Sequence, residues 1–166
     1  MMMSRPAFLF ASLVLVTAGI RADADPDPVE RGAYLARIMD CAGCHMPRGA
    51  DGVPILEAGL SGGNVGFEIP GLGVFWAPNL TPADTGLGSW TETEIADAIR
   101  QGIRPDGRIL APAMPWPSFA ALSDEDVEAL AAYLQSLPPV DAPRLDPVEQ
   151  ADAARAPFYR VMLPTN

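Results

Sequence analysis

The sequence predicts an all-α fold whose core is completed by a large apolar group. Residues 27–40, 91–102 and 123–137 have the apolar spacing and the end signals of helices. Between the first two segments, residues 47–90 hold 10 glycines and 5 prolines and show no sustained periodicity. A connection of that length is uncommon in a compact domain. We therefore expect these loops to wrap around the large apolar group that completes the core.

The first predicted helix begins near Asp27, which can cap it. Pro28 suits the first helical position, and Glu30 stands three residues after the cap, as in a capping box. Gly32 lies on the apolar stripe and leaves room for another helix to cross closely. The other members of that stripe are Val29, Ala33, Leu35, Ala36 and Met39.

Two further helices carry similar signals. Thr91 and Glu94 form a capping box, and Gly102 ends that helix. Ser123 caps the last helix, and Pro138 ends it. Their predicted buried faces consist of Ile95, Ala98 and Ile99, and of Val127, Leu130, Ala131, Leu134 and Leu137.

The run Cys41-Ala42-Gly43-Cys44-His45 follows the first helix directly. Two thiols at this spacing, with a histidine after the second, are typical of covalent haem c attachment. Each thiol forms a thioether with the haem, and His45 binds the iron. Cys41 and Cys44 are the only cysteines in the sequence and His45 is the only histidine. Ligation of the iron by two histidines of this chain is therefore excluded.

Two other interpretations of the motif fit less well. A structural zinc site takes four cysteine or histidine ligands, and this sequence offers three, so carboxylates would have to complete it. A redox-active Cys-x-x-Cys pair belongs at the start of a helix that follows a strand. Here the preceding segment is predicted to be helical.

Met114 is the predicted second axial ligand of the iron. It lies between Pro112 and Pro115, and prolines on both sides restrict the backbone as a rigidly held thioether requires. Other methionines are less suitable. Met46 adjoins His45, Met39 lies on the first helix and Met162 lies in the tail.

The loops supply candidates for contacts to the haem propionates. Trp76, Asn79 and Trp90 carry side-chain N–H groups in this region, although tryptophan in a small core is usually a packing residue. Residues 67–69 and 72–76 also predict a short hairpin.

The two ends of the chain lie outside the predicted haem domain, residues 25–137. Residues 1–24 have the pattern of a secretory signal peptide, with an uncleaved anchor as the alternative. Removing them would change the formal charge from −10 to −11. This acidity argues against nucleic-acid partners, and favours proteins with a basic docking patch. Residues 138–166 form a proline-rich extension that we expect to pack back onto the domain.

Four segments resemble the cytochrome c subunits of bacterial membrane-bound alcohol, aldehyde and gluconate dehydrogenases, and class I cytochromes c generally. They are residues 77–82 (APNLTP), 86–90 (GLGSW), 102–108 (GIRPDGR) and 112–115 (PAMP). The resemblance implies a class I cytochrome c fold, in which the N- and C-terminal helices cross and loops wrap the haem. It implies that Cys41 and Cys44 bind haem c and that His45 and Met114 ligate iron. Residues implied near the propionates are Asn79, Trp90 and Arg108.

These observations predict a periplasmic protein with one covalent haem c. We expect it to pass single electrons from a dehydrogenase donor to a downstream cytochrome or terminal oxidase, with no transmembrane segment in the mature chain. A haem enzyme or ligand sensor with a labile sixth ligand is the alternative. That class would need an open iron site and acid–base groups beside it, and the only histidine is already assigned.

Overall fold

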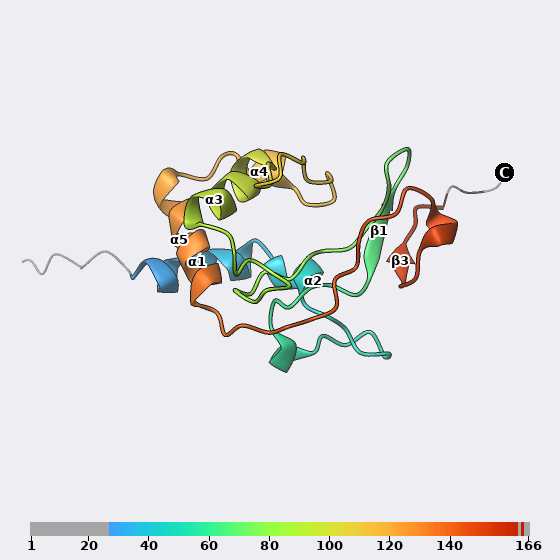
Figure 1. The fold of residues 1–166 in the computed structure, drawn as a ribbon, viewed down its shortest axis with the longest axis horizontal. Coiled ribbons are helices and arrows are strands. Elements are labelled where there is room, and N and C mark those ends of the chain that lie inside the picture. Colours follow the sequence, from blue (N-terminus) through green and yellow to red (C-terminus); the bar gives the residue numbers. More distant parts are fainter. Residues whose placement is uncertain (1–26, 163, 165–166) are drawn as a thin grey trace, which may run out of the picture.

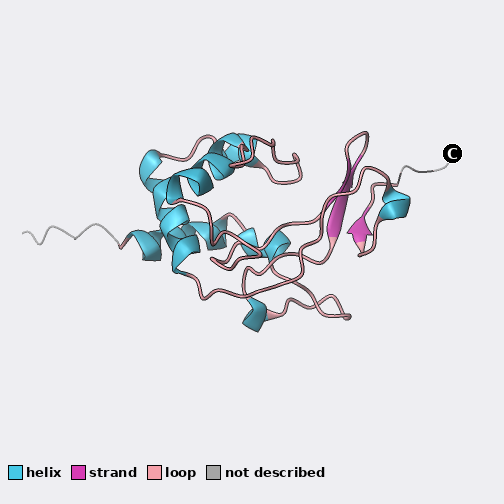
Figure 2. Cartoon of the chain, in the orientation of Figure 1, coloured by secondary structure: helices cyan, strands magenta, loops and turns pink. Residues whose placement is uncertain are grey.

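The computed structural model describes residues 27–162 and residue 164, so the predicted signal peptide lies outside the described residues. Helices dominate one end and a small sheet the other (Figures 1 and 2). In chain order the elements are α1 (Pro28–Ile38), α2 (Cys41–His45), η1 (Leu56–Ala58), β1 (Gly66–Ile69), β2 (Gly73–Phe75), α3 (Glu92–Gln101), α4 (Trp116–Phe119), α5 (Asp124–Ser136), η2 (Ala151–Ala153) and β3 (Phe158–Tyr159).

Helices α1 and α5 cross in direct backbone contact at Gly32. A Cβ built on Gly32 would lie 2.0 Å from the carbonyl oxygen of Ala129 and 2.6 Å from Cβ of Tyr133. Only glycine permits an approach this close. The Arg31 side chain, one residue before, donates to Asp126 of α5 across the crossing at 2.6 Å. The close crossing predicted from Gly32 is therefore confirmed.

The predicted N-terminal caps are present, although Asp27 caps α1 without the reciprocal bond from Glu30 that a capping box would add. Asp27 accepts from the backbone N–H of Val29 at 2.8 Å, and Thr91 and Glu94 form a capping box. Ser123 accepts from the N–H of Asp126 at 3.1 Å. Most of the predicted apolar faces lie in one core, whose buried members are Leu35, Ala36, Leu60, Leu87, Ile95, Ile99, Val127, Leu130, Ala131 and Leu134. Val29 and Ala33 are only half-buried, and Ala98 is buried outside this cluster.

The prediction of an all-α fold is incomplete, because the structure also has a three-stranded sheet. β1 and β2 form the expected antiparallel hairpin, with Phe67 opposite Phe75. β3 pairs with β1 in parallel, which gives the order β2-β1-β3. A strand of two residues carries too little alternation to be recognised in a sequence.

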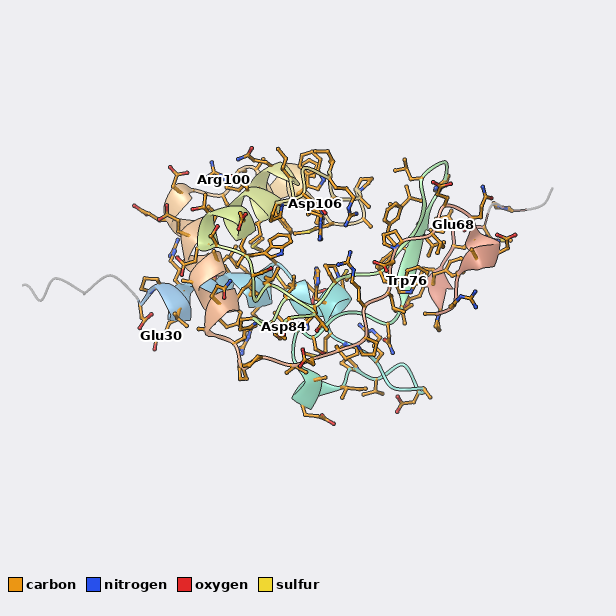
Figure 3. All side chains as sticks on the ribbon, in the orientation of Figure 1. Glu30, Glu68, Trp76, Asp84, Arg100 and Asp106 are labelled. Carbon is orange, nitrogen blue, oxygen red and sulfur yellow. The ribbon has the colours of Figure 1, made fainter. Side chains whose placement is uncertain are left out.

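The C-terminal extension packs back onto the domain, as expected. Val148 exchanges two backbone hydrogen bonds with Val74 of β2, at 2.8 and 3.1 Å. The indole N–H of Trp76, labelled in Figure 3, donates to the carbonyl of Pro157 at 3.1 Å. Through residue 162, the described helices include none that is both long and apolar enough to cross a membrane.

Candidate haem-binding site

Helix α2 presents the two cysteines one helical turn apart. Residues three apart lie on the same side of a helix, so Cys41 and Cys44 share a face. Both thiols are free and half-buried. Asp40 directly precedes α2 and has the left-handed conformation, with φ 54°, which aspartate tolerates better than most residues. Its carboxylate lies where a side chain at Gly43 would be.

Both thiols stay protonated at neutral pH. Burial raises the pKa of Cys41 to about 11, and the carboxylate of Asp40 adds to this effect. Burial, followed by Asp40, also raises the pKa of Cys44. Nucleophilic redox cysteines have lowered pKa values. The surroundings of this pair therefore do not favour thiol–disulfide chemistry.

His45 is held in one orientation by the backbone. Its side chain is 7% exposed, and Nδ1 lies 2.8 Å from the carbonyl oxygen of Pro78. A carbonyl only accepts, so Nδ1 carries the proton and Nε2 has the free lone pair that a metal needs. Burial lowers the pKa of His45, and the bond to Pro78 partly opposes this shift. The ring is therefore neutral at neutral pH.

Met114 lies in a tight turn between α3 and α4. The backbone N–H of Met114 donates to Ala111 at 3.1 Å, and the N–H of Trp116 donates to Met114 at 2.8 Å. The Trp116 ring in turn lies where a side chain on Gly102 would be, within 2.6 Å. The turn is thus tied to the end of α3. The Met114 side chain is half-buried against the same core cluster that contacts Cys41 and Ala42.

Asn79 and Trp76 make contacts within the protein. Asn79 is buried, and its amide nitrogen donates to Thr85 Oγ1 at 3.1 Å and to the Val140 carbonyl at 2.7 Å. Both of its N–H groups are therefore in use, and a contact to a propionate would require one of them to be exchanged. The single N–H of Trp76 is bonded to Pro157. Propionate contacts by these two residues stay predictions.

Trp90 lies directly before the Thr91 cap of α3, and Arg108 lies in the loop after α3. The guanidinium of Arg104 stands 5.0 Å from the centre of the Trp90 ring. The backbone N–H of Arg108 donates to Asp106 at 3.0 Å, and its side chain is exposed. Trp90 is half-buried against the core cluster that also contacts Met114. Their predicted propionate contacts likewise stay predictions.

Two residues that contact predicted site residues have no signal in the sequence. Pro78 acts through its carbonyl, which no side-chain pattern reports. Arg104 lies in the same 102–108 segment as Arg108, and the sequence alone does not distinguish their surroundings. Its contact with Trp90 joins residues 14 positions apart through the fold of the intervening helix.

The donor set fits haem c and does not fit a structural metal ion. Two cysteines on one face of α2 match the spacing of thioether attachment, and the adjoining imidazole has its Nε2 lone pair available for iron. Among the described residues, no three histidine, cysteine or carboxylate side chains are grouped so that they could hold a metal ion. This counts against the zinc alternative.

Comparison with known proteins agrees with this assignment. Residues 29–138 match the family model described as Cytochrome c. The chain is 39% identical over 127 residues to the cytochrome c subunit of alcohol dehydrogenase (quinone) from Gluconacetobacter polyoxogenes, covering 75% of this chain and 25% of the relative. It is 40% identical over 141 residues to the fructose dehydrogenase cytochrome subunit of Gluconobacter japonicus, covering 79% and 27%.

A third relative is the cytochrome c subunit of gluconate 2-dehydrogenase from Pantoea cypripedii. It is 39% identical over 127 residues, which cover 74% of this chain and 27% of the relative. The chain thus spans about a quarter of the length of these relatives. The match covers both cysteines, His45 and Met114, and on this basis the chain belongs to the cytochrome c family.

Proposed function

We propose that this protein is a periplasmic c-type cytochrome with one haem, which carries single electrons from a dehydrogenase to a downstream cytochrome or terminal oxidase. Cys41 and Cys44 hold the haem by thioether bonds, and His45 Nε2 and the Met114 sulfur bind its iron. The observation that carries the proposal is the buried imidazole of His45, whose Nδ1 lies 2.8 Å from the Pro78 carbonyl oxygen, next to the two cysteines of α2.

Haem iron supplies a one-electron couple whose potential depends on its axial ligands. The protein has to keep both ligands in place while the charge of the iron changes between its oxidised and reduced states. His45 is held by Pro78, and Met114 by the turn from Ala111 to Trp116. Because His45 is the only histidine, no imidazole is left to move protons for a substrate. Retention of both ligands therefore supports electron transfer rather than a haem enzyme or ligand sensor.

The proposed redox partners are inferred from the names of the three relatives and from the negative charge of this chain. All three relatives are named as cytochrome subunits of dehydrogenases, which supports a dehydrogenase as donor. The formal charge of −10 supports a basic docking patch on at least one partner. Reduction by such a partner slows as salt is added, because charges more than about 10 Å apart are screened at 0.1 M ionic strength.

Carbon monoxide tests the proposal against its alternative. The intact reduced protein at neutral pH is expected not to bind carbon monoxide and to lack peroxidase turnover, while a periplasmic dehydrogenase reduces it rapidly and reversibly. Met114→Ala is the matched positive control, because it opens the iron and should bind the gas. Rapid binding by the unmodified protein would assign it to the haem-enzyme and sensor class. A rate of reduction that does not depend on salt concentration would contradict only the inferred basic docking patch on the partner, and the electron-transfer proposal would stand.

Export is the basis of the proposed location. Residues 1–24 have the pattern of a signal peptide, and covalent haem attachment fits maturation outside the cytoplasm. Fractionation of cells that express the full chain should recover coloured protein in the periplasm. An N-terminus beginning at Asp25 would show cleavage, whereas coloured protein retained in the membrane with an intact N-terminus would show an anchor.

A further inference from the structure

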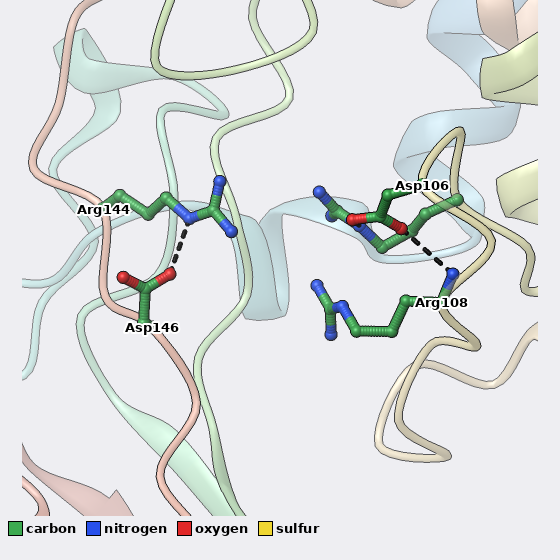
Figure 4. A network of polar contacts seen from close by, with 5 residues as sticks. Asp106, Arg108, Arg144 and Asp146 are labelled. Carbon is green, nitrogen blue, oxygen red and sulfur yellow. Dashed lines mark hydrogen bonds and ion pairs between the residues drawn. The ribbon is translucent and has the colours of Figure 1, made fainter.

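Three arginines from two distant parts of the sequence gather at one place. Arg104 and Arg108 lie in the loop after α3, and Arg144 lies in the C-terminal extension. Figure 4 shows the guanidinium groups of Arg108 and Arg144 pointing toward one another across the space between these segments. A gathering of three cations is unexpected in a chain whose formal charge is −10. We call these three residues the arginine cluster.

Arg104 is the inner member of the arginine cluster. Its side chain is 13% exposed, lies over Trp90 and contacts Asp106 at 3.4 Å. Burial lowers the pKa of Arg104, and Arg108 and Arg144 lower it further, while Asp106 acts in the opposite direction. The charged groups that face one another here are thus three guanidiniums and the carboxylates of Asp106 and Asp146. The cations outnumber the anions.

The extension is fixed on both sides of Arg144. On one side, Val140 accepts from Asn79 at 2.7 Å, and Ala142 donates to Thr85 at 3.1 Å. On the other side, Val148 pairs with Val74. The short segment between these anchors carries Arg144 and its partner Asp146, which are 2.8 Å apart. The position of Arg144 opposite Arg108 is therefore set by the fold.

We propose that Arg144 of the C-terminal extension binds the two carboxylates of the haem together with Arg104 and Arg108. The extension would then form one wall of the haem site. This rests on the proposed haem c. Arginine pairs with carboxylates through two parallel N–H bonds, and a carboxylate taken out of water needs such a partner. One of these carboxylates would also offset the excess of one cation in the cluster. Arg104 links the cluster to the haem surroundings, since Trp90 beneath it packs against the core cluster that Met114 contacts.

The test uses the intact haem protein and its reduction potential as a function of pH. Arg144→Gln removes a positive charge that favours the reduced iron and the ionised carboxylates. We expect a lower potential, with the pH-dependent part of the curve moved to higher pH. Arg155→Gln is the matched control, because it removes one exposed arginine from the same extension at a place outside the arginine cluster. It should leave both quantities close to those of the unmodified protein.

A second pair of variants separates charge from structure. Asp146→Asn breaks the same ion pair as Arg144→Gln. It leaves Arg144 in place, with a positive charge that Asp146 no longer balances. Binding of carboxylates by the cluster predicts that Asp146→Asn raises the potential and moves the pH curve to lower pH, opposite to Arg144→Gln. Asp152→Asn, an exposed aspartate of the same extension, is its control. A purely structural role of the ion pair predicts the same direction for both variants and would overturn the proposal.

Phosphate distinguishes carboxylates of the haem from an anion in solution. At constant ionic strength, added phosphate should leave the difference between the unmodified protein and Arg144→Gln unchanged. If phosphate abolished that difference, the cluster would bind a solution anion and the assignment would be wrong. Identical curves for Arg144→Gln and Arg155→Gln would also overturn it. Both results leave covalent haem intact, whereas a chain that matures without covalent haem contradicts the proposed function itself.

Discussion

The ring of His45 donates from Nδ1 to the backbone carbonyl of Pro78 at 2.8 Å, and this bond determines which nitrogen remains for iron. The two residues lie 33 positions apart. The carbonyl therefore positions the imidazole only when the loop that carries Pro78 has folded over α2. Folding of that loop and formation of the iron site are coupled.

Acid should destabilise the protein through His45. Burial lowers its folded-state pKa below the unfolded value of 6.5, so the unfolded chain takes up a proton that the folded chain does not. Stability is full above pH 6.5 and falls as the pH drops below it, by up to about 1.4 kcal/mol per pH unit for one group. Binding of Nε2 to iron acts in the same direction. Denaturant unfolding at pH 7.5 and 5.5 measures this difference, and an unchanged free energy of unfolding would contradict it.

Replacing both cysteines should release the haem. The colour of the unmodified protein is expected to stay with the polypeptide through denaturing acid–acetone extraction, because thioethers survive this treatment. The variant with Cys41→Ser and Cys44→Ser should give extractable haem or a colourless protein. Each single variant keeps one thioether and should retain colour after extraction. Extractable haem from the unmodified protein, matured in a host able to attach it, would refute covalent attachment.

Local signals account for what the sequence could predict. The caps at Asp27, Thr91 and Ser123, the close crossing at Gly32 and the hairpin at Phe67 depend on neighbouring residues or on one conspicuous residue type, and all are present. The pairing of β3 with β1 and the 5.0 Å contact between Arg104 and Trp90 arise only when distant segments meet. Arg104 shows the limit well. The resemblance points to Arg108, four residues further along the chain, whereas the fold leaves Arg108 exposed and the Arg104 side chain only 13% exposed.

Gly32→Ala should destabilise the protein although alanine favours helix. In an isolated helix this change would be stabilising by about 1 kcal/mol. Here the new Cβ would lie 2.0 Å from the Ala129 carbonyl, a backbone atom that cannot rotate away. Separating α1 from α5 should cost about 2 kcal/mol or more. Tyr34→Ala, at an exposed position in the middle of α1, is the control and should change the unfolding free energy little. A stabilised Gly32→Ala protein would show that the crossing is looser than described.

Trp76→Phe should loosen the end of the extension while keeping the aromatic ring. The change removes the N–H that donates to Pro157, at a cost of about 1 kcal/mol. Faster amide hydrogen exchange is expected around residues 157–159. Trp116→Phe removes a similar bond, to Leu110 at 3.3 Å, and should affect the 110–116 turn instead. Equal exchange in the extension of both variants would show that Trp76 does not anchor it.

Met114→Ala should change the spectrum and the potential together. Methionine bound to oxidised haem iron gives a weak absorption near the red end of the spectrum, and its loss reports loss of that bond. The reduction potential should fall, since axial ligands tune haem potentials over a range of roughly 0.8 V. Met39→Ala and Met162→Ala are the controls, one packed against the core and the other 77% exposed. Because each control removes a thioether from a different place, the bound methionine is the one whose loss removes the absorption band. If Met39→Ala or Met162→Ala removed it while Met114→Ala did not, the turn between α3 and α4 would not supply the ligand.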